Sequence, residues 1–385
     1  MVRVCKRSAC KFCPYIYAMR LCAALKRLAA RGLGAYVESE ETMVVSQHVN
    51  APAQIRQDAA LSPAQTLWDL TGEDMAAVDA LILDRMQSSV GLIPDLAEHL
   101  VGAGGKRLRP LLTISAAQLC GYQGDAHHKL AAAVEFIHSA TLLHDDVVDE
   151  SALRRGKKPA NLIWGNSASI LVGDFLFARA FNLMVETDSM EALGILSNAS
   201  SVIAEGEVQQ LAALRNLAMT EADYMRVIEA KTAALFAAAT EVAPVIAKRP
   251  AAERAALREY GLKLGLAFQL VDDALDYGGM ASALGKSVGD DFREGKMTLP
   301  VIRSLQQATD KDRAFWRRVI VDHDQKDVDL ERAVSLLRKS GALESTMELA
   351  KQYSQDAADA LDVFPVTPLR DTLKDLAGFV VSRIS

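Results

Sequence analysis

The chain has 385 residues, of which 50% are hydrophobic and only 6% aromatic, and its formal net charge is −6. This length accommodates one large domain or two ordinary ones, and the alanine- and leucine-rich composition favours helices over sheets. The acidic balance argues against nucleic-acid binding, whose usual footprint is a basic face. No apolar run reaches the ~18 residues of a membrane span. We therefore expect a soluble, cytoplasmic protein without a membrane-spanning segment.

The first part of the chain differs from the rest, because residues 1–37 carry eight lysines and arginines and no acidic residue. Four cysteines lie here, namely Cys5, Cys10, Cys13 and Cys22. Their C-x4-C-x2-C spacing imitates an iron–sulfur run, but no suitably placed later cysteine completes it, so we expect free thiols. We interpret residues 1–60 as a flexible N-terminal extension without an assigned function. A targeting segment and a basic surface helix at a membrane are the alternatives.

Residues 61–385 alternate helical runs of roughly 10–25 residues with turn signals, and no period-2 strand pattern stands between them. Typical breaks are GYQGD at 121–125, KRP at 248–250 and FPVTP at 364–368. The pattern predicts one all-α domain, a single large bundle of about ten or more helices around a central cavity.

The first motif of interest is GGKRLRP at residues 104–110, where glycines end one helix and Pro110 opens the next. Lys106 and Arg109 are one helical turn apart at this junction, where backbone N–H groups are free to bind anions. The motif therefore predicts a phosphate-binding site.

Next along the chain is EFIHSATLLHDDVVDESALRRG, which contains Asp145-Asp146-Val-Val-Asp149. Asp145 and Asp149 are four residues apart, so both project from one helix face. His138 lies two turns earlier, and Arg154 and Arg155 follow the predicted helix end. Carboxylates beside guanidinium groups suit a diphosphate bound through Mg²⁺. The alternative is a solvated acidic helix end with ordinary salt bridges.

A second motif of the same pattern, FQLVDDALD, makes that alternative weaker. Its aspartates are Asp272, Asp273 and Asp276, and Gln269 lies one turn before them. The loop GKSVGDDFREGKMTLP follows and supplies Lys286 and Lys296, which can act as point charges on a phosphate. A mobile surface loop is the alternative for these lysines. Earlier in the chain, the pair Lys231-Thr232 lies within an alanine-rich helix and either extends to the surface or faces the same anionic cavity.

These motifs, in this order, resemble those of the trans-isoprenyl diphosphate synthases, in the long-chain polyprenyl branch, over roughly residues 60–385. The resemblance implies an all-α isoprenoid synthase fold and a prenyltransferase that repeatedly condenses isopentenyl diphosphate with an allylic diphosphate such as farnesyl diphosphate. It also implies Mg²⁺ as the cofactor, at about three ions per active site, and a homodimer. Transient membrane contact for product release is compatible with this function.

The resemblance assigns roles to the residues of the motifs. The metal ligands would be Asp145, Asp149, Asp272, Asp273 and Asp276. Residues around the allylic diphosphate would be Arg154, Lys231, Thr232, Gln269, Lys286 and Lys296. The isopentenyl diphosphate would be held by Lys106, Arg109, His138 and Arg155. Among all of these, Asp145, Asp149, Arg154, Lys231, Asp272 and Asp273 would be the catalytic residues.

Product length depends, in that family, on the residues shortly before the first aspartate motif. Ala140 and Thr141 are small here, whereas bulky aromatic residues at these positions close the pocket in short-chain enzymes. Small residues also permit simple helix–helix packing. Phe136 and Ile137 lie deeper and are candidates for the floor of the pocket. We expect an octaprenyl to decaprenyl product, suited to a quinone side chain.

Three other functions fit parts of the pattern. A short-chain farnesyl or geranylgeranyl diphosphate synthase uses the same chemistry. A subunit of a heteromeric synthase would normally lack some of the aspartates or basic residues, which are retained here. A terpene cyclase would carry a different second metal motif and no second diphosphate site.

Overall fold

The computed structural model describes residues 62–102, 107–151, 153–154, 156–278 and 289–382. Helices make up nearly all of this region, and its β-type pairing is limited to one isolated bridge between Arg154 and Lys157. The predicted all-α class is therefore confirmed. The expected N-terminal extension lies outside the described residues, and so do Lys106, Arg155 and Lys286.

The first half of the helical body comprises α2 (Pro63–Arg85), α3 (Leu92–Gly102), α4 (Leu108–Leu119), α5 (Ala126–Val148), α6 (Ala160–Trp164), α7 (Asn166–Val185) and α8 (Met190–Ala213). The middle comprises α9 (Glu221–Ile228), a π-helical turn η1 (Glu229–Ala233), α10 (Ala234–Ile246), α11 (Ala251–Gly278) and α12 (Asp290–Glu294). The last part comprises α13 (Leu299–Gln306), α14 (Asp310–Trp316), the π turn η3 (Arg317–Val321), α15 (Asp329–Lys339), α16 (Ala342–Ala360), the 3₁₀ turn η4 (Leu361–Val363) and α17 (Pro368–Ser382).

Several helices begin and end where the local sequence predicts. Ser62 caps α2 by accepting a hydrogen bond from the backbone N–H of Gln65, and Pro63 occupies the first helical position. Thr220 and Asp223 form a reciprocal capping box at the start of α9. Gly295 ends α12 in the left-handed conformation at φ 73°, which glycine adopts without steric cost.

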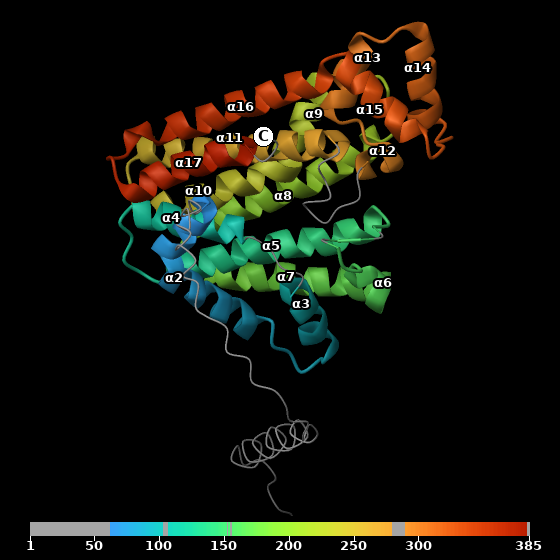
Figure 1. The fold of residues 1–385 in the computed structure, drawn as a ribbon. Coiled ribbons are helices and arrows are strands. Elements are labelled where there is room, and N and C mark those ends of the chain that lie inside the picture. The colour runs from blue at the N-terminus through green and yellow to red at the C-terminus, as the bar shows by residue number, and fades with distance from the viewer. Residues whose placement is uncertain (1–61, 103–106, 152, 155, 279–288, 383–385) are drawn as a thin grey trace, which may run out of the picture. The chain divides into compact units, whose positions relative to one another are not determined.

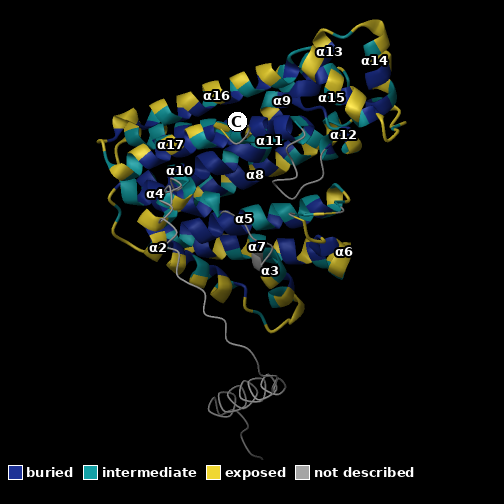
Figure 2. Cartoon of the chain, viewed as in Figure 1, coloured by how far each residue is buried: buried dark blue, intermediate teal, exposed yellow. Residues whose placement is uncertain are grey.

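Two apolar clusters form the core of the described residues, and α11 belongs to both. Figure 2 shows the buried residues of these helices in dark blue. Leu257 and Leu264 in the first half of α11 pack into a cluster with α2, α4, α5, α7, α8, α10 and α17. Leu270 and Tyr277 in its second half pack into a cluster with α9 and α13–α16. The second aspartate motif therefore lies on a helix that is fixed by both clusters.

The helices α5 and α11 run in the same direction through the bundle, so their C-terminal ends lie at the same end in Figure 1. Between these helices lie α8, η1 and α10, with α10 packing against α4, α5, α8 and α11. Both aspartate motifs are consequently placed at one end of the helical body.

Among the described residues, α7 is the one helix that is long and apolar enough, by length and composition, to cross a membrane. Asp174 and Arg179 lie within it, so it contains no uninterrupted apolar run of the length that a membrane span needs. A core helix passes the same test, and α7 packs extensively along α5, so we interpret it as part of the bundle.

The approach of α8 to the π turn depends on Gly206. A Cβ atom at this position would lie 2.8 Å from the Cβ of Ala230 and 2.8 Å from the backbone N of Lys231. Such separations are too short for a carbon atom, so a side chain here would push η1 away from α8. By contrast, a Cβ at Gly194, also within α8, would meet no atom within 4 Å.

We expect Gly206→Ala and Gly194→Ala to change stability in opposite directions. Alanine at the open position should raise the free energy of unfolding by up to about 1 kcal/mol through helix propensity. Alanine at Gly206 should lower it by about 1–3 kcal/mol through overpacking. Urea unfolding followed by circular dichroism measures both. An equal gain in the two variants would show that the contact between α8 and η1 is not tight.

Candidate active site

The end of α5 presents the aspartates of the first motif in different directions. Asp149 caps the helix, and its backbone N–H donates to the carbonyl of Asp145 over 2.8 Å. Asp146 is only 1% exposed and accepts from the guanidinium of Arg154, with the shortest N–O distance 2.6 Å. The backbone carbonyl of Asp146 accepts from Asn161 at 2.9 Å. Asp146 and Arg154 thus fasten the segment after α5 to the helix.

Lys231 lies on the π turn η1 and connects two carboxylates from neighbouring helices. Its Nζ is 2.6 Å from Oε2 of Glu207 on α8 and 3.7 Å from Oδ2 of Asp145 on α5. A π turn inserts a residue into the helical register and is common at functional sites. Lys231 is therefore held between α8 and α5, beside Asp145 of the first aspartate motif.

A chain of hydrogen bonds holds the second motif. The Thr232 hydroxyl donates to Oε1 of Gln269 at 2.8 Å, and Nε2 of Gln269 donates to Oδ1 of Asp273 at 2.7 Å. The Tyr224 hydroxyl donates to the other oxygen of Asp273 at 2.6 Å. Burial raises the pKa of Asp273 to about 7, although these two hydrogen bonds act in the opposite direction. Asp273 is thus a buried carboxyl with both oxygens fixed.

The remaining aspartates of the second motif have separate surroundings. Asp276 accepts from the backbone N–H groups of Asp290 and Asp291 over 3.2 and 3.1 Å. It thereby caps the short helix α12 and fixes the position of the segment that leads to Lys296. Asp272 is half-buried on the same helix.

Lys296 links the two motifs electrostatically. Its Nζ lies 3.3 Å from Oδ2 of Asp149 and 2.5 Å from Oε2 of Glu294. Burial lowers the pKa of Lys296, but Asp291, Asp149 and Glu294 outweigh it, so the net shift is upward. The charge of Lys296 also acts on Asp145 in the first motif and Asp273 in the second. The two motifs therefore surround one common region.

This region holds an excess of negative charge. Burial raises the pKa of Asp145, and the neighbouring Asp149 raises it further. Burial and Asp145 raise the pKa of Glu207, while burial, Asp273 and Asp276 raise that of Asp291 well above its ordinary value. Each upward shift means that the ionised carboxylate is unfavourable in this environment. The site offers carboxylate oxygens with too few positive charges around them. Mg²⁺ binds such hard oxygen donors, so the residues fit the expected cofactor.

The predicted basic site is described only in part. Arg109 lies near the start of α4, and its guanidinium carbon is 4.4 Å from the ring centroid of Phe236 on α10, as in a cation–π contact. His138 is half-buried on α5, which packs against α4. The neighbouring Arg107 instead pairs with Glu135 of α5 at 2.5 Å. Arg109 and His138 thus lie on adjacent helices.

The residues before the first motif differ in exposure. Ala140 is fully buried in the core, whereas Thr141 is half-buried and donates to the carbonyl of His138 at 2.8 Å. Beside α5 lies a small hollow of about 10 Å³, which is room for about one water molecule. It is lined by Ile82, Met86, Leu100, Arg107, Glu135, Phe136, Ser139 and Leu176. Phe136 borders this space, while Ile137 is buried in the core.

Three residues of this region were missed by the sequence analysis. Asp291 belongs to the GDDFREGK segment, where it stands next to Asp290, and these adjacent acids are a signal that the sequence does contain. Glu207 is one of three glutamates on α8, and Tyr224 is an isolated aromatic residue, so neither has a spacing that identifies it. Their roles come from contacts between helices that are distant in sequence.

The chain is similar to known proteins over most of its length. The family model for polyprenyl synthetases matches residues 91–337 of this chain. Octaprenyl diphosphate synthase of Escherichia coli is 46% identical over 82% of this chain and 97% of its own length.

Two solved structures are also similar. A polyprenyl synthase from Caulobacter crescentus, complexed with calcium and isoprenyl diphosphate, is 57% identical, with a TM-score of 0.81 over 84% of this chain and 98% of its own. A decaprenyl diphosphate synthase from Rhodobacter capsulatus is 56% identical, with a TM-score of 0.81 over 84% of this chain and 100% of its own. With its helical fold and paired aspartate motifs, the chain belongs to the polyprenyl synthetase family and is a prenyl-transferring enzyme.

Proposed function

We propose that this enzyme condenses isopentenyl diphosphate repeatedly with an allylic diphosphate, such as farnesyl diphosphate, to give a long-chain all-trans polyprenyl diphosphate. Its product would range from octaprenyl to decaprenyl and serve as a quinone side chain made in the cytoplasm. The observation that carries the proposal is the region between Asp149 and Asp291, where Lys296 pairs with Asp149 of the first motif and acts electrostatically on Asp291 and on Asp273 of the second.

Asp145 and Asp149, together with Asp272, Asp273 and Asp276, are the residues that would hold about three Mg²⁺ ions. Bound Mg²⁺ would supply positive charge to the allylic diphosphate as its C–O bond breaks. Lys231 and Lys296 lie beside the same carboxylates and would add charge on the diphosphate oxygens. By resemblance to the family, Arg154 and Lys286 would also contact the allylic diphosphate.

Thr232 and Gln269 act on this arrangement through Asp273, because their hydrogen-bond chain ends on one of its oxygens. Fixed donors require no reorganisation when charge develops, which is the main source of electrostatic catalysis. We infer that Tyr224 contributes in the same way from the other side of Asp273.

The second substrate would be bound through its diphosphate by Lys106, Arg109, His138 and Arg155. Holding isopentenyl diphosphate there would place its double bond close to the allylic cation. A new C–C bond forms, a proton is lost to the departing diphosphate, and the product is again an allylic diphosphate. No side chain in the described part of the chain is assigned as a dedicated base.

The small side chains before the first motif support a long product. Ala140 and Thr141 place no bulky barrier on α5 shortly before the aspartates. Octaprenyl and decaprenyl diphosphate synthases among the relatives are consistent with this length.

The outer faces of α6 and α7 support a homodimer. Large apolar side chains are exposed there, namely Leu162, Ile163, Ile170, Leu171, Phe181 and Val185. Large apolar side chains exposed on two helices that pack against each other are typical of an interaction site. Two copies of one chain can cover such faces reciprocally around a two-fold axis.

The proposed reaction is tested with purified protein, Mg²⁺, farnesyl diphosphate and labelled isopentenyl diphosphate, followed by sizing of the dephosphorylated products. We expect a ladder that ends between octaprenyl and decaprenyl. A product that stops at farnesyl or geranylgeranyl length would identify a short-chain synthase. Absence of incorporation would contradict the proposal and favour a subunit that requires a partner.

In the same assay, Asp145→Asn should lower turnover by more than about 100-fold, because it removes a carboxylate from the metal-binding set. The matched control is Asp84→Asn, which changes an exposed aspartate on α2. Circular dichroism should show unchanged helicity in both variants. Full activity of Asp145→Asn would remove the first motif from the metal site.

Thr141→Phe should shorten the product, since the added ring would obstruct the path along α5. Thr141→Val is the control, because it removes the hydrogen bond to the His138 carbonyl without adding bulk. We expect Thr141→Val to leave the product length unchanged. Identical ladders from the phenylalanine variant and the wild type would mean that the chain grows along another route.

Leu171→Glu should convert the dimer to a monomer, because it places a charge on the apolar face of α7. Leu171 is 66% exposed, and Val366, which is 75% exposed in the segment before α17, provides the control variant Val366→Glu. Sedimentation velocity distinguishes the two states. A Leu171→Glu variant that sediments as the wild type would place the subunit interface elsewhere.

A further inference from the structure

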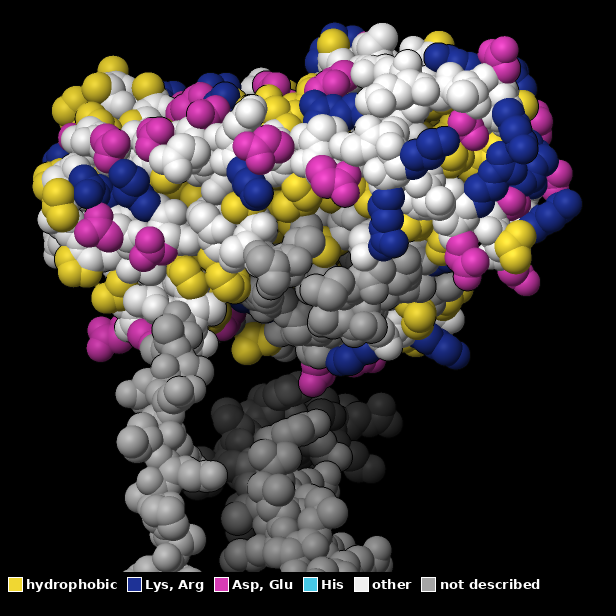
Figure 3. All heavy atoms as spheres, turned by 45° about the horizontal axis from the view of Figure 1, so that its top comes forward, with side chains coloured by type: hydrophobic (Ala, Val, Ile, Leu, Met, Phe, Trp, Pro, Cys, Tyr) yellow, Lys and Arg dark blue, Asp and Glu magenta, His cyan; other side chains and the backbone are white. Residues whose placement is uncertain are grey.

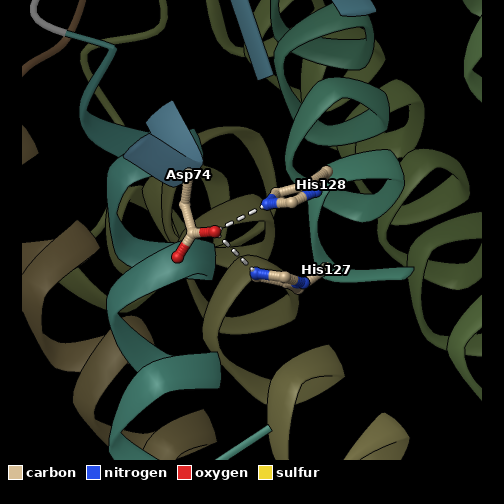
Figure 4. Close-up of side chains that lie close together, drawn as sticks. All are labelled: Asp74, His127 and His128. Atoms are coloured by element: carbon tan, nitrogen blue, oxygen red, sulfur yellow. Dashed lines mark hydrogen bonds and ion pairs between the residues drawn. The ribbon is translucent and has the colours of Figure 1, made fainter. Parts of the chain in front are cut away.

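A group of polar side chains outside the active site joins α2 to the first turn of α5. It consists of Asp74, His127 and His128 (Figure 4), and we call it the His–Asp cluster. His127 precedes Asp145 along α5 by 18 residues, which corresponds to about 27 Å at the rise of an α-helix. The cluster is therefore remote from the carboxylates that hold the substrates and has no part in the proposed reaction.

Both imidazole rings point the same nitrogen at one carboxylate oxygen. The Nε2 atom of His128 is 2.8 Å from Oδ1 of Asp74, and Nε2 of His127 is 3.4 Å from the same oxygen (Figure 4). The two rings lie beside each other with centroids 4.0 Å apart. Three potential ligand atoms from two helices thus converge on one point.

Surrounding side chains fix this arrangement. Nε2 of Gln118 donates to the second oxygen of Asp74 at 2.7 Å, and the ring of Tyr122 packs edge-on against His127 with centroids 5.4 Å apart. Hydrogen bonds that orient a ligating carboxylate are a regular feature of metal sites. His127 is 5% exposed, and its buried Nδ1 has no hydrogen-bond partner among the described residues. Its polar interactions are therefore made through Nε2.

The two nitrogen–oxygen distances are close to the ligand–ligand spacing of a tetrahedral metal site. Zinc binds histidine nitrogen and carboxylate oxygen at about 2.0–2.2 Å, so two ligand atoms at a tetrahedral angle are roughly 3.4 Å apart. The His127–Asp74 separation has this length, and the His128–Asp74 separation would need to lengthen by roughly 0.6 Å to match. His128 and Asp74 are half-buried, which leaves one side open for water as a further ligand.

The donor set selects the kind of metal ion. Two imidazoles with one carboxylate suit zinc, whereas magnesium prefers oxygen ligands throughout. We propose that Asp74, His127 and His128 form a Zn²⁺ site, separate from the carboxylates of the active site, that ties α2 to α5.

The competing explanation is that Asp74, His127 and His128 link α2 and α5 through hydrogen bonds alone. Measuring whether the protein retains zinc distinguishes this explanation from a zinc site. The full chain is stripped with a chelator, its accessible cysteines are alkylated, and Zn²⁺ is added in the presence of a large excess of Mg²⁺. Alkylation removes binding by the cysteines near the N-terminus, and Mg²⁺ competes at the active site. After desalting, we expect one zinc ion per chain and a raised melting temperature, because the metal binds the folded state.

His128→Gln and Asp74→Asn should each weaken zinc binding by about tenfold or more and abolish the rise in melting temperature. His323→Gln, which removes an exposed imidazole elsewhere, should bind zinc as the wild type does. Substitution with Co²⁺ should give the strong visible absorption of a tetrahedral site in the wild type alone. Both cluster variants should retain prenyl transfer with Mg²⁺, which shows that they are folded.

Three results would overturn the proposal. The first is a wild type that retains no zinc, and the second is equal retention by the wild type, His128→Gln and Asp74→Asn. The third is zinc that remains in both cluster variants but is lost in Asp145→Asn, which would place it in the active site. None of these results bears on the proposed reaction, because that reaction is assayed with Mg²⁺ alone.

Discussion

The constraint on which this structure depends is the repulsion between carboxylates gathered at one end of a helical bundle. Asp149 ends α5 and Asp273 lies on α11, and Lys296 interacts electrostatically with both. Without cations, the arrangement would disfavour ionisation, as the raised pKa values of Asp145 and Asp291 indicate. The same property makes the site suitable for Mg²⁺ and for a substrate that develops negative charge as it reacts.

Much of the surrounding structure serves to hold these groups in place. Gly206 lets α8 approach the π turn closely enough for Glu207 to bind Lys231. Asp276 caps α12 and so positions the segment that carries Lys296. The charged site is thus built on packed helices. On the face of the molecule shown in Figure 3, by comparison, acidic and basic side chains are interspersed over the surface.

Helix α5 connects the features discussed above. Its last turn carries the first aspartate motif, its middle borders the hollow beside Phe136, and its first turn carries the His–Asp cluster. Anchoring its N-terminal turn to α2 would restrain the whole helix, because a packed helix moves as a rigid element. A metal there would act on stability rather than on chemistry.

The sequence alone determined the helical class, the family and the residues of both aspartate motifs, because helical periodicity fixes which positions share a face. Only the tertiary structure decided which partners those residues meet. It turned Asp146 towards Arg154, brought Glu207 and Tyr224 to the site, and used Asp276 as a cap. It also placed the apolar α7 within the bundle. These outcomes depend on packing between helices far apart in the chain, which local spacing does not encode.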